Sequence, residues 1–309
     1  MQLWNKLGLV FDPKKHNTPQ WMLQYAAVPF VEMLNECVIR IYFSSRNRNN
    51  KSLTGWADFN IDNILSGPIN ISQEPLLNLG RKGMFDEDGI MGCHITMINN
   101  KRNFYYIGWN LGHSTPFRNA IGIAVENDKG IFSKISEGPI VDRSIHDKCF
   151  VASNCVFVEE NYYRLYYLSC DEWLDDGEKL IHKYNIKYAE STDGINWERQ
   201  GLVAIDFKYE NEYAISVPRV IKENDLYKMW YSFRGGKKSE LYRIGYAESK
   251  DGKIWVRKDD LVSIIGENNE WDSNMLCYPF IFDHGGERYM LYNGNDYGKT
   301  GFGIAQLEK

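Results

Sequence analysis

Long apolar segments are missing from this 309-residue sequence. No stretch approaches the roughly 20 apolar residues that a membrane-spanning helix needs. The first ten residues, MQLWNKLGLV, lack the basic segment, apolar run and small-residue cleavage site of a secretory signal. The six cysteines are scattered without Cys-x-x-Cys spacing, and a chain of this length does not need disulfide bonds to fold. We therefore expect a cytoplasmic protein with reduced thiols and no membrane span.

Metal-binding and phosphate-binding motifs are also absent. The six histidines form no His-x-His or His-Glu-x-x-His pair, so neither a metal site nor a cofactor is predicted. The segment FRGGKKSE, which begins at Phe233, matches no P-loop, and we interpret it as a hairpin loop. The acidic segment DEWLDDGEK, which begins at Asp171, lacks the ligand spacing of a calcium loop.

Positive charge is not concentrated in any part of the sequence. Lys and Arg number 36 against 41 Asp and Glu, which gives a net charge of −5 and no basic block that could follow a phosphate backbone. Nucleic acid is therefore not expected as a partner. Hydrophobic residues make up 43% of the chain and charged residues 25%, which is typical of a globular core and excludes disordered and fibrous classes.

Aromatic residues, in contrast, are abundant. The chain contains 20 Tyr, 15 Phe and 9 Trp, more than a core of this size needs. Aromatic rings are common walls of ligand pockets, and they are also the usual platforms for the faces of sugars. The composition therefore points to a ligand.

A repeated pattern of strands runs along the chain. A strand with a Gly-x-Ala-like core ends at Ala57, Ala124, Ala189, Ala247 and Ala305, so successive alanines lie 58 to 67 residues apart. An aromatic strand of period two precedes each one, as in RIYFSS and KMWYSF, and another apolar strand precedes that. Asp-Gly turns, as in STDGINW, lead into a fourth strand. Four antiparallel strands repeated five times, without an amphipathic helix, predict an all-β, five-bladed β-propeller.

The two ends of the chain complement each other in this pattern. The last repeat stops after its third strand, whereas the N-terminal segment WNKLGLV, from Trp4, has the Trp-x3-Gly-Leu-Val spacing of the fourth strand WERQGLV, from Trp197. We therefore predict that the N-terminal strand completes the last blade and covers its open edge. The whole chain, residues 1–309, is then a single propeller domain.

Carboxylates precede the first strand of several repeats. Asp88, Glu212 and Asp272 lie six or seven residues before the His or Pro of that strand. First strands line the channel of a propeller, and carboxylates at one depth suit general acid–base chemistry on a glycosidic bond, where one is protonated and another ionised. We predict these three as the catalytic acids. The alternative is structural, because Asp and Glu are common in loops before strands.

The repeat pattern and two of these segments resemble a known group. FDEDGIMG, from Phe85, and WDSNMLCYP, from Trp271, resemble the five-bladed β-propeller glycosidases, a superfamily that includes arabinanases, invertases and mannoside phosphorylases. PFRNAIGIA, from Pro116, and FVASNCV, from Phe150, resemble glycosidase-like proteins associated with surface-polysaccharide biosynthesis. The resemblance covers the whole chain and implies the propeller fold and an activity on sugars.

The acids depart from the pattern of the hydrolytic families. Those families carry an Asp base on the first blade, an Asp on the second and a Glu acid on the third. Asp88 matches the second position, but the first-repeat segment QWMLQYAAV contains no acid, and the third repeat offers Asp147 without a Glu. The resemblance therefore implies either that the roles are redistributed over other blades or that the protein binds glycans without cleaving them.

Further polar and aromatic residues are candidates for sugar subsites. Arginine forks suit an acidic sugar, a phosphosugar or free phosphate, and aromatic rings suit sugar faces. Surface ion pairs and core packing are the structural alternatives for these residues. The candidate substrate-binding residues are Arg46, His94, Trp109, Arg118, Asn119, Asp147, Arg219 and Tyr278.

The sequence thus predicts a protein that cleaves or transfers a glycosidic bond in a glycan or small sugar, as a hydrolase or a phosphorylase. Acids on separate blades predict the wider carboxyl spacing of about 6.5–9.5 Å that leaves room for water or phosphate and belongs to inversion. Two alternatives remain open. One is a catalytically silent, glycan-binding propeller in polysaccharide biosynthesis, and the other is a protein-interaction propeller.

Overall fold

The computed structural model describes residues 1–175, 177–236, 240–266 and 271–309. Strands dominate this part of the chain, and its helical elements are single short turns. These are η1 (Pro13–Lys15), η2 (Ile61–Ser66), η3 (Asp259–Leu261) and α1 (Asn295–Gly298). None of the described helices is long and apolar enough to cross a membrane. The prediction of an all-β protein is confirmed.

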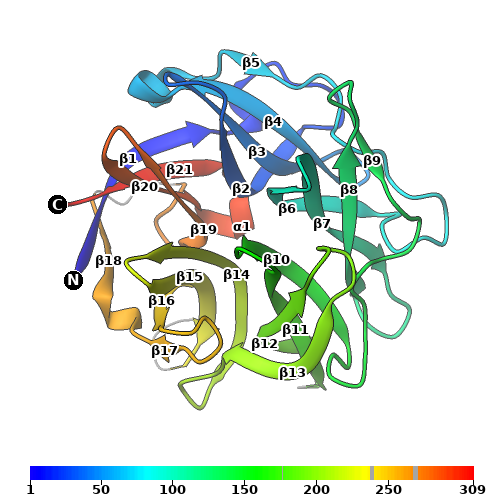
Figure 1. Cartoon of the computed structure of the whole chain (residues 1–309). Coiled ribbons are helices and arrows are strands. Elements are labelled where there is room, and N and C mark those ends of the chain that lie inside the picture. The colour runs from blue at the N-terminus through cyan, green and yellow to red at the C-terminus, as the bar shows by residue number, and fades with distance from the viewer. Residues whose placement is uncertain (176, 237–239, 267–270) are drawn as a thin grey trace.

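Strand pairing forms three sheets in the described chain, one of five strands and two of eight. Each eight-stranded sheet consists of two antiparallel groups, so the strands can be described as five successive groups, here called units, which follow one another in colour around the molecule in Figure 1. Unit 1 contains β2 (Gln24–Met33), β3 (Val38–Arg46), β4 (Ser52–Asn60) and β5 (Asn70–Ile71). Unit 2 contains β6 (Gly89–Ile98), β7 (Lys101–Leu111), β8 (Phe117–Glu126) and β9 (Phe132–Lys134). Unit 3 contains β10 (Phe150–Val158), β11 (Tyr163–Asp175), β12 (Leu180–Ser191) and β13 (Glu198–Ile205).

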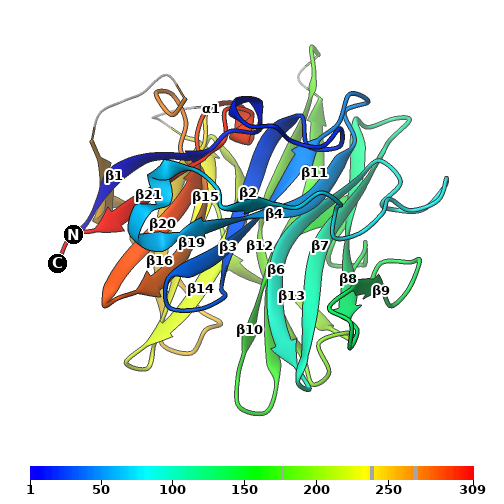
Figure 2. The ribbon, with the colours of Figure 1, turned by 90° about the horizontal axis from the view of Figure 1, so that it is seen from above.

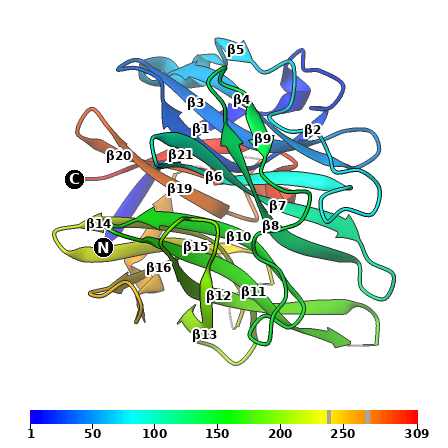
Figure 3. The same cartoon turned by 45° about the vertical axis from the view of Figure 1, so that its right-hand side comes forward.

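The remaining strands form the other two units. Unit 4 contains β14 (Glu212–Glu223), β15 (Leu226–Gly235), β16 (Arg243–Ser249) and β17 (Val256–Arg257). Unit 5 contains β19 (Cys277–His284), β20 (Glu287–Asn293), β21 (Phe302–Leu307), β1 (Gln2–Phe11) and β18 (Val262–Ile265). Short parallel pairings join unit 1 to unit 2 and unit 3 to unit 4. Figure 3 shows units 3 and 4, in green to yellow, side by side.

The first strands of the units face one another around the middle of the molecule (Figure 1). β2 contacts β6, β6 contacts β10, β10 contacts β14, β14 contacts β19, and β19 contacts β2. Asn293 of unit 5 strengthens the last contact, because its side chain accepts from the Val28 amide at 2.8 Å and donates to the Ala26 carbonyl at 2.8 Å. The arrangement is propeller-like, with side chains of the first strands converging on one central region.

The N-terminal strand completes unit 5. β1 pairs antiparallel with β21, with Trp4 opposite Leu307 and Lys6 opposite Ala305, and Figure 2 shows the two chain ends close together. The Trp4 side chain is fully buried, and it lies edge-on to Trp230 of unit 4. The predicted pairing of the N-terminal segment with the last repeat is confirmed.

The Gly-x-Ala repeat reflects close contact between the second and third strands. A Cβ atom at Gly122 would lie 2.2 Å from the Tyr106 ring, and one at Gly245 would lie 2.4 Å from the Tyr231 ring. Glycine therefore makes room for an aromatic side chain of the neighbouring strand. The alanine two positions later is buried, as at Ala124, which belongs to a hydrophobic cluster with Phe30 and Tyr42 of unit 1.

Each first strand carries a β-bulge where it reaches the middle of the molecule, and the ladder register shifts there in all five units. Three of the bulged residues, Val28, Val217 and Tyr278, have positive φ, a strained conformation for residues other than glycine. The neighbouring unit holds each in place. The Val217 amide donates to Ser153 Oγ at 2.9 Å, and the Tyr278 amide donates to Ser232 Oγ at 2.7 Å.

Deleting residues 1–10 tests the role of the N-terminal strand. The deletion exposes the edge of β21 and removes the buried Trp4, so we expect the melting temperature to fall by at least about 10 °C, or the protein to aggregate. Differential scanning fluorimetry measures the change. Leu7→Ala is the matched control, because Leu7 lies on the same strand and is 41% exposed; a truncated protein as stable as this control would refute the role of β1.

Candidate functional site

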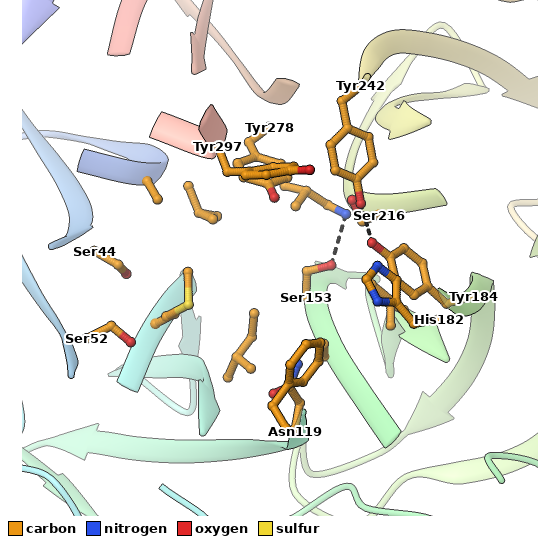
Figure 4. A pocket seen from close by; sticks show the side chains of 18 of the residues that line it. Ser44, Ser52, Asn119, Ser153, His182, Tyr184, Ser216, Tyr242, Tyr278 and Tyr297 are labelled. Carbon is orange, nitrogen blue, oxygen red and sulfur yellow. Dashed lines mark hydrogen bonds between the residues drawn. The ribbon is translucent and has the colours of Figure 1, made fainter. Parts of the chain in front are cut away.

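A cavity of about 460 Å³ opens where the first strands of the units meet. Its wall is rich in aromatic rings and hydroxyl groups, several of which are visible in Figure 4. The aromatic lining residues are Tyr25, Phe117, Phe150, Tyr184, Tyr242, Tyr278 and Tyr297. The serine lining residues are Ser44, Ser52, Ser153 and Ser216. The cavity is large enough for a small ligand and presents both apolar faces and hydrogen-bonding groups to it.

One wall of the cavity is a hydrogen-bonded aromatic cluster from units 3 and 4. The hydroxyl groups of Tyr184 and Tyr242 hydrogen-bond to each other, and the His182 ring stacks on Tyr184 at 4.9 Å between centroids (Figure 4). Burial and the neighbouring Arg234 lower the pKa of His182 to about 4. His182 is therefore neutral near pH 7, and it accepts a hydrogen bond from the Arg234 guanidinium at 2.5 Å.

The charged groups that line the cavity are cations. Arg46 and Arg234 contribute guanidinium groups, and no Asp or Glu belongs to the cavity lining within the described ranges. At the bulges, the first strands instead present small or apolar side chains to the cavity, such as Ala27, Met91 and Ser153. A pair of carboxylates of the kind that general acid–base cleavage of a glycosidic bond requires is therefore not part of this wall.

The predicted acids lie inside the units instead. In units 2 to 5, a buried carboxylate accepts a hydrogen bond from a tyrosine of the second strand and pairs with a cation of the fourth strand. The carboxylates are those of Asp86, Asp147, Asp259 and Asp272. We call this arrangement the carboxylate clamp. The tyrosines are Tyr106, Tyr167, Tyr231 and Tyr292, and the cations are Lys134, Arg199, Arg257 and Lys6.

Asp272 belongs to this arrangement, and Glu212 lies beside it in unit 4, where it shares Arg257 with the clamp carboxylate Asp259. Arg257 forms a two-pronged ion pair with Glu212, at 2.7 and 2.9 Å, and Asp272 pairs with Lys6 at 3.1 Å. Glu212 is 3% exposed and Asp272 is 2% exposed. Burial, together with the Asp272 charge, raises the pKa of Tyr292, so this phenol stays protonated and donates to the carboxylate at 3.1 Å.

Asp147 and Asp88 also have partners away from the cavity. Asp147 is fully buried and accepts from Arg199 at 2.7 Å and from Ser169 at 2.7 Å. Asp88 pairs with Lys51 at 3.2 Å and accepts from the Leu111 amide at 2.9 Å, while Asp86 takes the clamp position of unit 2. None of these four acids belongs to the cavity lining, and each one faces a cation or a backbone donor.

Three of the predicted substrate-binding residues line the cavity: Arg46, Asn119 and Tyr278. The strand alternation places Arg118, next to Asn119, on the opposite face, where it is exposed. Trp109 lies just outside the lining and donates from Nε1 to Ser52 Oγ at 2.5 Å, with its ring 5.9 Å from the Arg46 guanidinium carbon.

His94 and Arg219 lie farther along their strands, outside the cavity lining. Arg219 is 4% exposed; it donates to the Cys93 carbonyl and covers the Phe280 ring at 4.6 Å. Its guanidinium is 3.4 Å from His94 Nδ1. Burial and Arg219 lower the pKa of His94 to about 3, so this imidazole is neutral. These two residues form an interior contact between units 2 and 4. Within the described ranges, no three His, Cys, Asp or Glu side chains gather as a metal site.

Comparison with known proteins places this chain among relatives of similar length. No family model matches it. The Mycobacterium tuberculosis protein Rv1502, described as uncharacterized, is 37% identical over 308 residues, which cover 99% of each chain. The chain belongs to the Rv1502 family.

Solved structures of glycoside hydrolases share the fold of this Rv1502-family chain. A glycoside hydrolase aligns with a TM-score of 0.72 and 16% identity, over 98% of this chain and 91% of the other. The Podospora anserina α-L-arabinofuranosidase, solved in complex with cellotriose, aligns with a TM-score of 0.66 and 9% identity, over 100% and 96%. At these identities the likeness shows a shared fold, and it agrees with the predicted resemblance to propeller glycosidases.

Arg234 lines the cavity of this Rv1502-family member, but it is not among the residues predicted from the sequence. It lies in FRGGKKSE, interpreted as a loop, whereas β15 continues through Arg234 to Gly235. A signal was present in the repeats: in RIYFSSR and KMWYSFR, each from the second strand of a unit, the final arginines Arg46 and Arg234 occupy equivalent positions. Aligning the two strands to their ends would have added Arg234 to the candidates.

Neutralising Glu212 and Asp272 tests their structural role. Glu212→Gln and Asp272→Asn each remove the negative charge from a buried ion pair, so we expect each to lower the free energy of unfolding by about 3–5 kcal/mol. Asp88→Asn is the control, with an expected loss of about 1 kcal/mol or less, because its partner Lys51 is 37% exposed. Thermal and urea unfolding measure these values. Unchanged stability in both variants would contradict the structural assignment.

Proposed function

We propose that this protein binds a sugar ligand in the central cavity. The observation that carries the proposal is the cavity wall itself, which combines aromatic rings with serine hydroxyls and Asn119 at the meeting point of the first strands. Sugars present apolar ring faces and many hydroxyl groups, and a wall of this composition matches both. The fold shared with glycoside hydrolases and with an arabinofuranosidase in complex with cellotriose supports the same class of ligand.

We also propose that the five units are the blades of one closed, five-bladed propeller domain that spans residues 1–309. The contacts from β2 through β6, β10, β14 and β19 back to β2 support this arrangement. Closure matters for function, because it lets all five first strands contribute side chains to the same cavity.

Binding without carboxylate chemistry is the leading form of this proposal. Cleavage through Asp88, Glu212 and Asp272 would require these acids to leave their cations and turn toward the cavity. Two of the three are buried in ion pairs, and removing a buried carboxylate from its partner is costly. We therefore propose a structural role for Glu212 and Asp272 and a ligand-binding role for the cavity.

Filling the cavity tests sugar binding directly. Asn119→Trp places a large ring in the cavity and should abolish sugar binding, measured by saturation-transfer NMR and on a glycan array. Arg118→Trp is the matched control, because the adjacent Arg118 is exposed and outside the lining. We expect the control to bind as the parent does. A parent that binds no sugar, or equal binding by both variants, would refute the proposal.

Glycosidic bond cleavage or transfer is the second candidate function, and the glycoside hydrolases of the same fold favour it. A screen of activated aryl glycosides, with and without phosphate, distinguishes it from binding alone. If the predicted acids are catalytic, Asp88→Asn, Glu212→Gln or Asp272→Asn lowers turnover by about 10²-fold or more. The binding proposal expects no turnover that depends on these acids, and inversion of the product would be tested only where such turnover is found.

A further inference from the structure

The Arg234 guanidinium is a buried cation that forms part of the cavity wall. It projects from β15 near the end of the strand, opposite Ala214 of β14, and it is 9% exposed. A guanidinium stays charged in proteins, so this site carries a full positive charge with little contact to water.

The partners of Arg234 are neutral. It donates to the Tyr297 hydroxyl at 2.8 Å and to His182 Nε2 at 2.5 Å, and it lies 4.7 Å from the Tyr242 ring centroid. Its Nε has no hydrogen-bond partner among the described residues, and no carboxylate of the described chain forms an ion pair with it. The aromatic rings and hydroxyl groups reduce the free-energy cost of burying this charge, but they carry no negative charge that would neutralise it.

Two other buried guanidinium groups of this chain have carboxylate partners. Arg164 pairs with Glu159 at 2.6 Å, and Arg257 pairs with Glu212 at 2.7 Å. Arg219 is also buried without a carboxylate, but it lies outside the cavity and donates to a backbone carbonyl. Arg234 is thus distinguished by being buried, unneutralised and placed where a ligand can reach it. Burying a charge of this kind costs free energy unless an opposite charge pairs with it.

The surroundings favour an anion as the missing partner. Arg46, at the equivalent position of unit 1, lines the same cavity, and the described lining contains no Asp or Glu. Two cations without a carboxylate give the cavity a positive potential. A guanidinium offers two parallel N–H donors, a geometry that matches the oxygens of a carboxylate or a phosphate.

We propose that Arg234 anchors an anionic group of the ligand, so that the cavity selects sugars that carry a carboxylate or a phosphate. The inference rests on the proposed sugar-binding function and specifies its ligand class. The anionic group lies against Arg234 beside Tyr297, and the sugar ring lies against the neighbouring aromatic wall. A neutral sugar of the same size leaves the guanidinium desolvated and unpaired, which is the physical basis of the discrimination.

Calorimetric titration at constant ionic strength tests the proposal. The probes are glucose, galactose and mannose, their uronic acids, their 1-phosphates, and inorganic phosphate. We expect at least one uronic acid or sugar phosphate to bind about 10–100-fold more tightly than its neutral parent sugar, since hydrogen bonds to charged groups are the stronger ones. The two anionic series distinguish carboxylate from phosphate as the preferred group.

Two variants identify the anchor. Arg234→Gln should remove the preference for anionic sugars while leaving the melting temperature within a few degrees of the parent or above it, because the variant removes an unneutralised buried charge. Arg118→Gln, an exposed arginine next to the cavity-lining Asn119, should change neither property. If Arg234→Gln does not fold, Arg234→Lys keeps the charge but loses the two-pronged geometry, and we expect it to weaken the preference about tenfold.

The outcomes separate this proposal from the sugar-binding function. Neutral and anionic sugars that bind equally, or a preference that survives in Arg234→Gln, would overturn the anchor while sugar binding stands. Inorganic phosphate that binds the parent but not Arg234→Gln, without binding of any sugar, would support the anchor and overturn the sugar function. A parent that binds none of the probes would overturn both.

Discussion

The carboxylate clamp is the interaction that links the strands within units 2 to 5. Outermost strands such as β9 and β17 are only three and two residues long, so backbone hydrogen bonds alone hold them weakly. The clamp adds a buried link between the second and fourth strands, and in units 2, 3 and 5 its carboxylate lies in the loop before the first strand. In unit 5 the ion pair joins Asp272 to Lys6 of β1. Pairing of β1 with β21 therefore also brings Lys6 to Asp272.

This use of the acids determines the chemistry of the cavity. The carboxylates that precede the first strands form ion pairs with lysines and arginines, and they do not line the cavity. The middle therefore retains aromatic rings, hydroxyls, and the two guanidinium groups of Arg46 and Arg234. The chain shares its fold with glycoside hydrolases, and the acids Asp147, Glu212 and Asp272 are held in ion pairs outside the cavity lining.

The repeat pattern was sufficient to predict the strands and the pairing of β1 with β21, because those features depend on local periodicity and on the matching Trp-x3-Gly-Leu-Val segments. The direction of the acids was not predictable in the same way. Whether a carboxylate such as Asp272 turns inward or outward depends on a cation from the other end of the chain, Lys6. Arg234 was missed for a local reason, since the glycines of FRGGKKSE suggested a loop from Phe233 onward, whereas β15 continues to Gly235.

The bulges of the first strands determine which backbone N–H groups remain free near the cavity. Val28, Val217 and Tyr278 each turn their amide toward a side chain of a neighbouring unit, to Asn293, Ser153 and Ser232. These three N–H groups donate hydrogen bonds between neighbouring units, so they are not free to form a backbone nest, the arrangement of N–H groups with which many proteins bind an anion. The positive charge of the wall therefore comes from the Arg46 and Arg234 side chains, and exchanging one of these arginines changes the charge of the wall without altering the backbone.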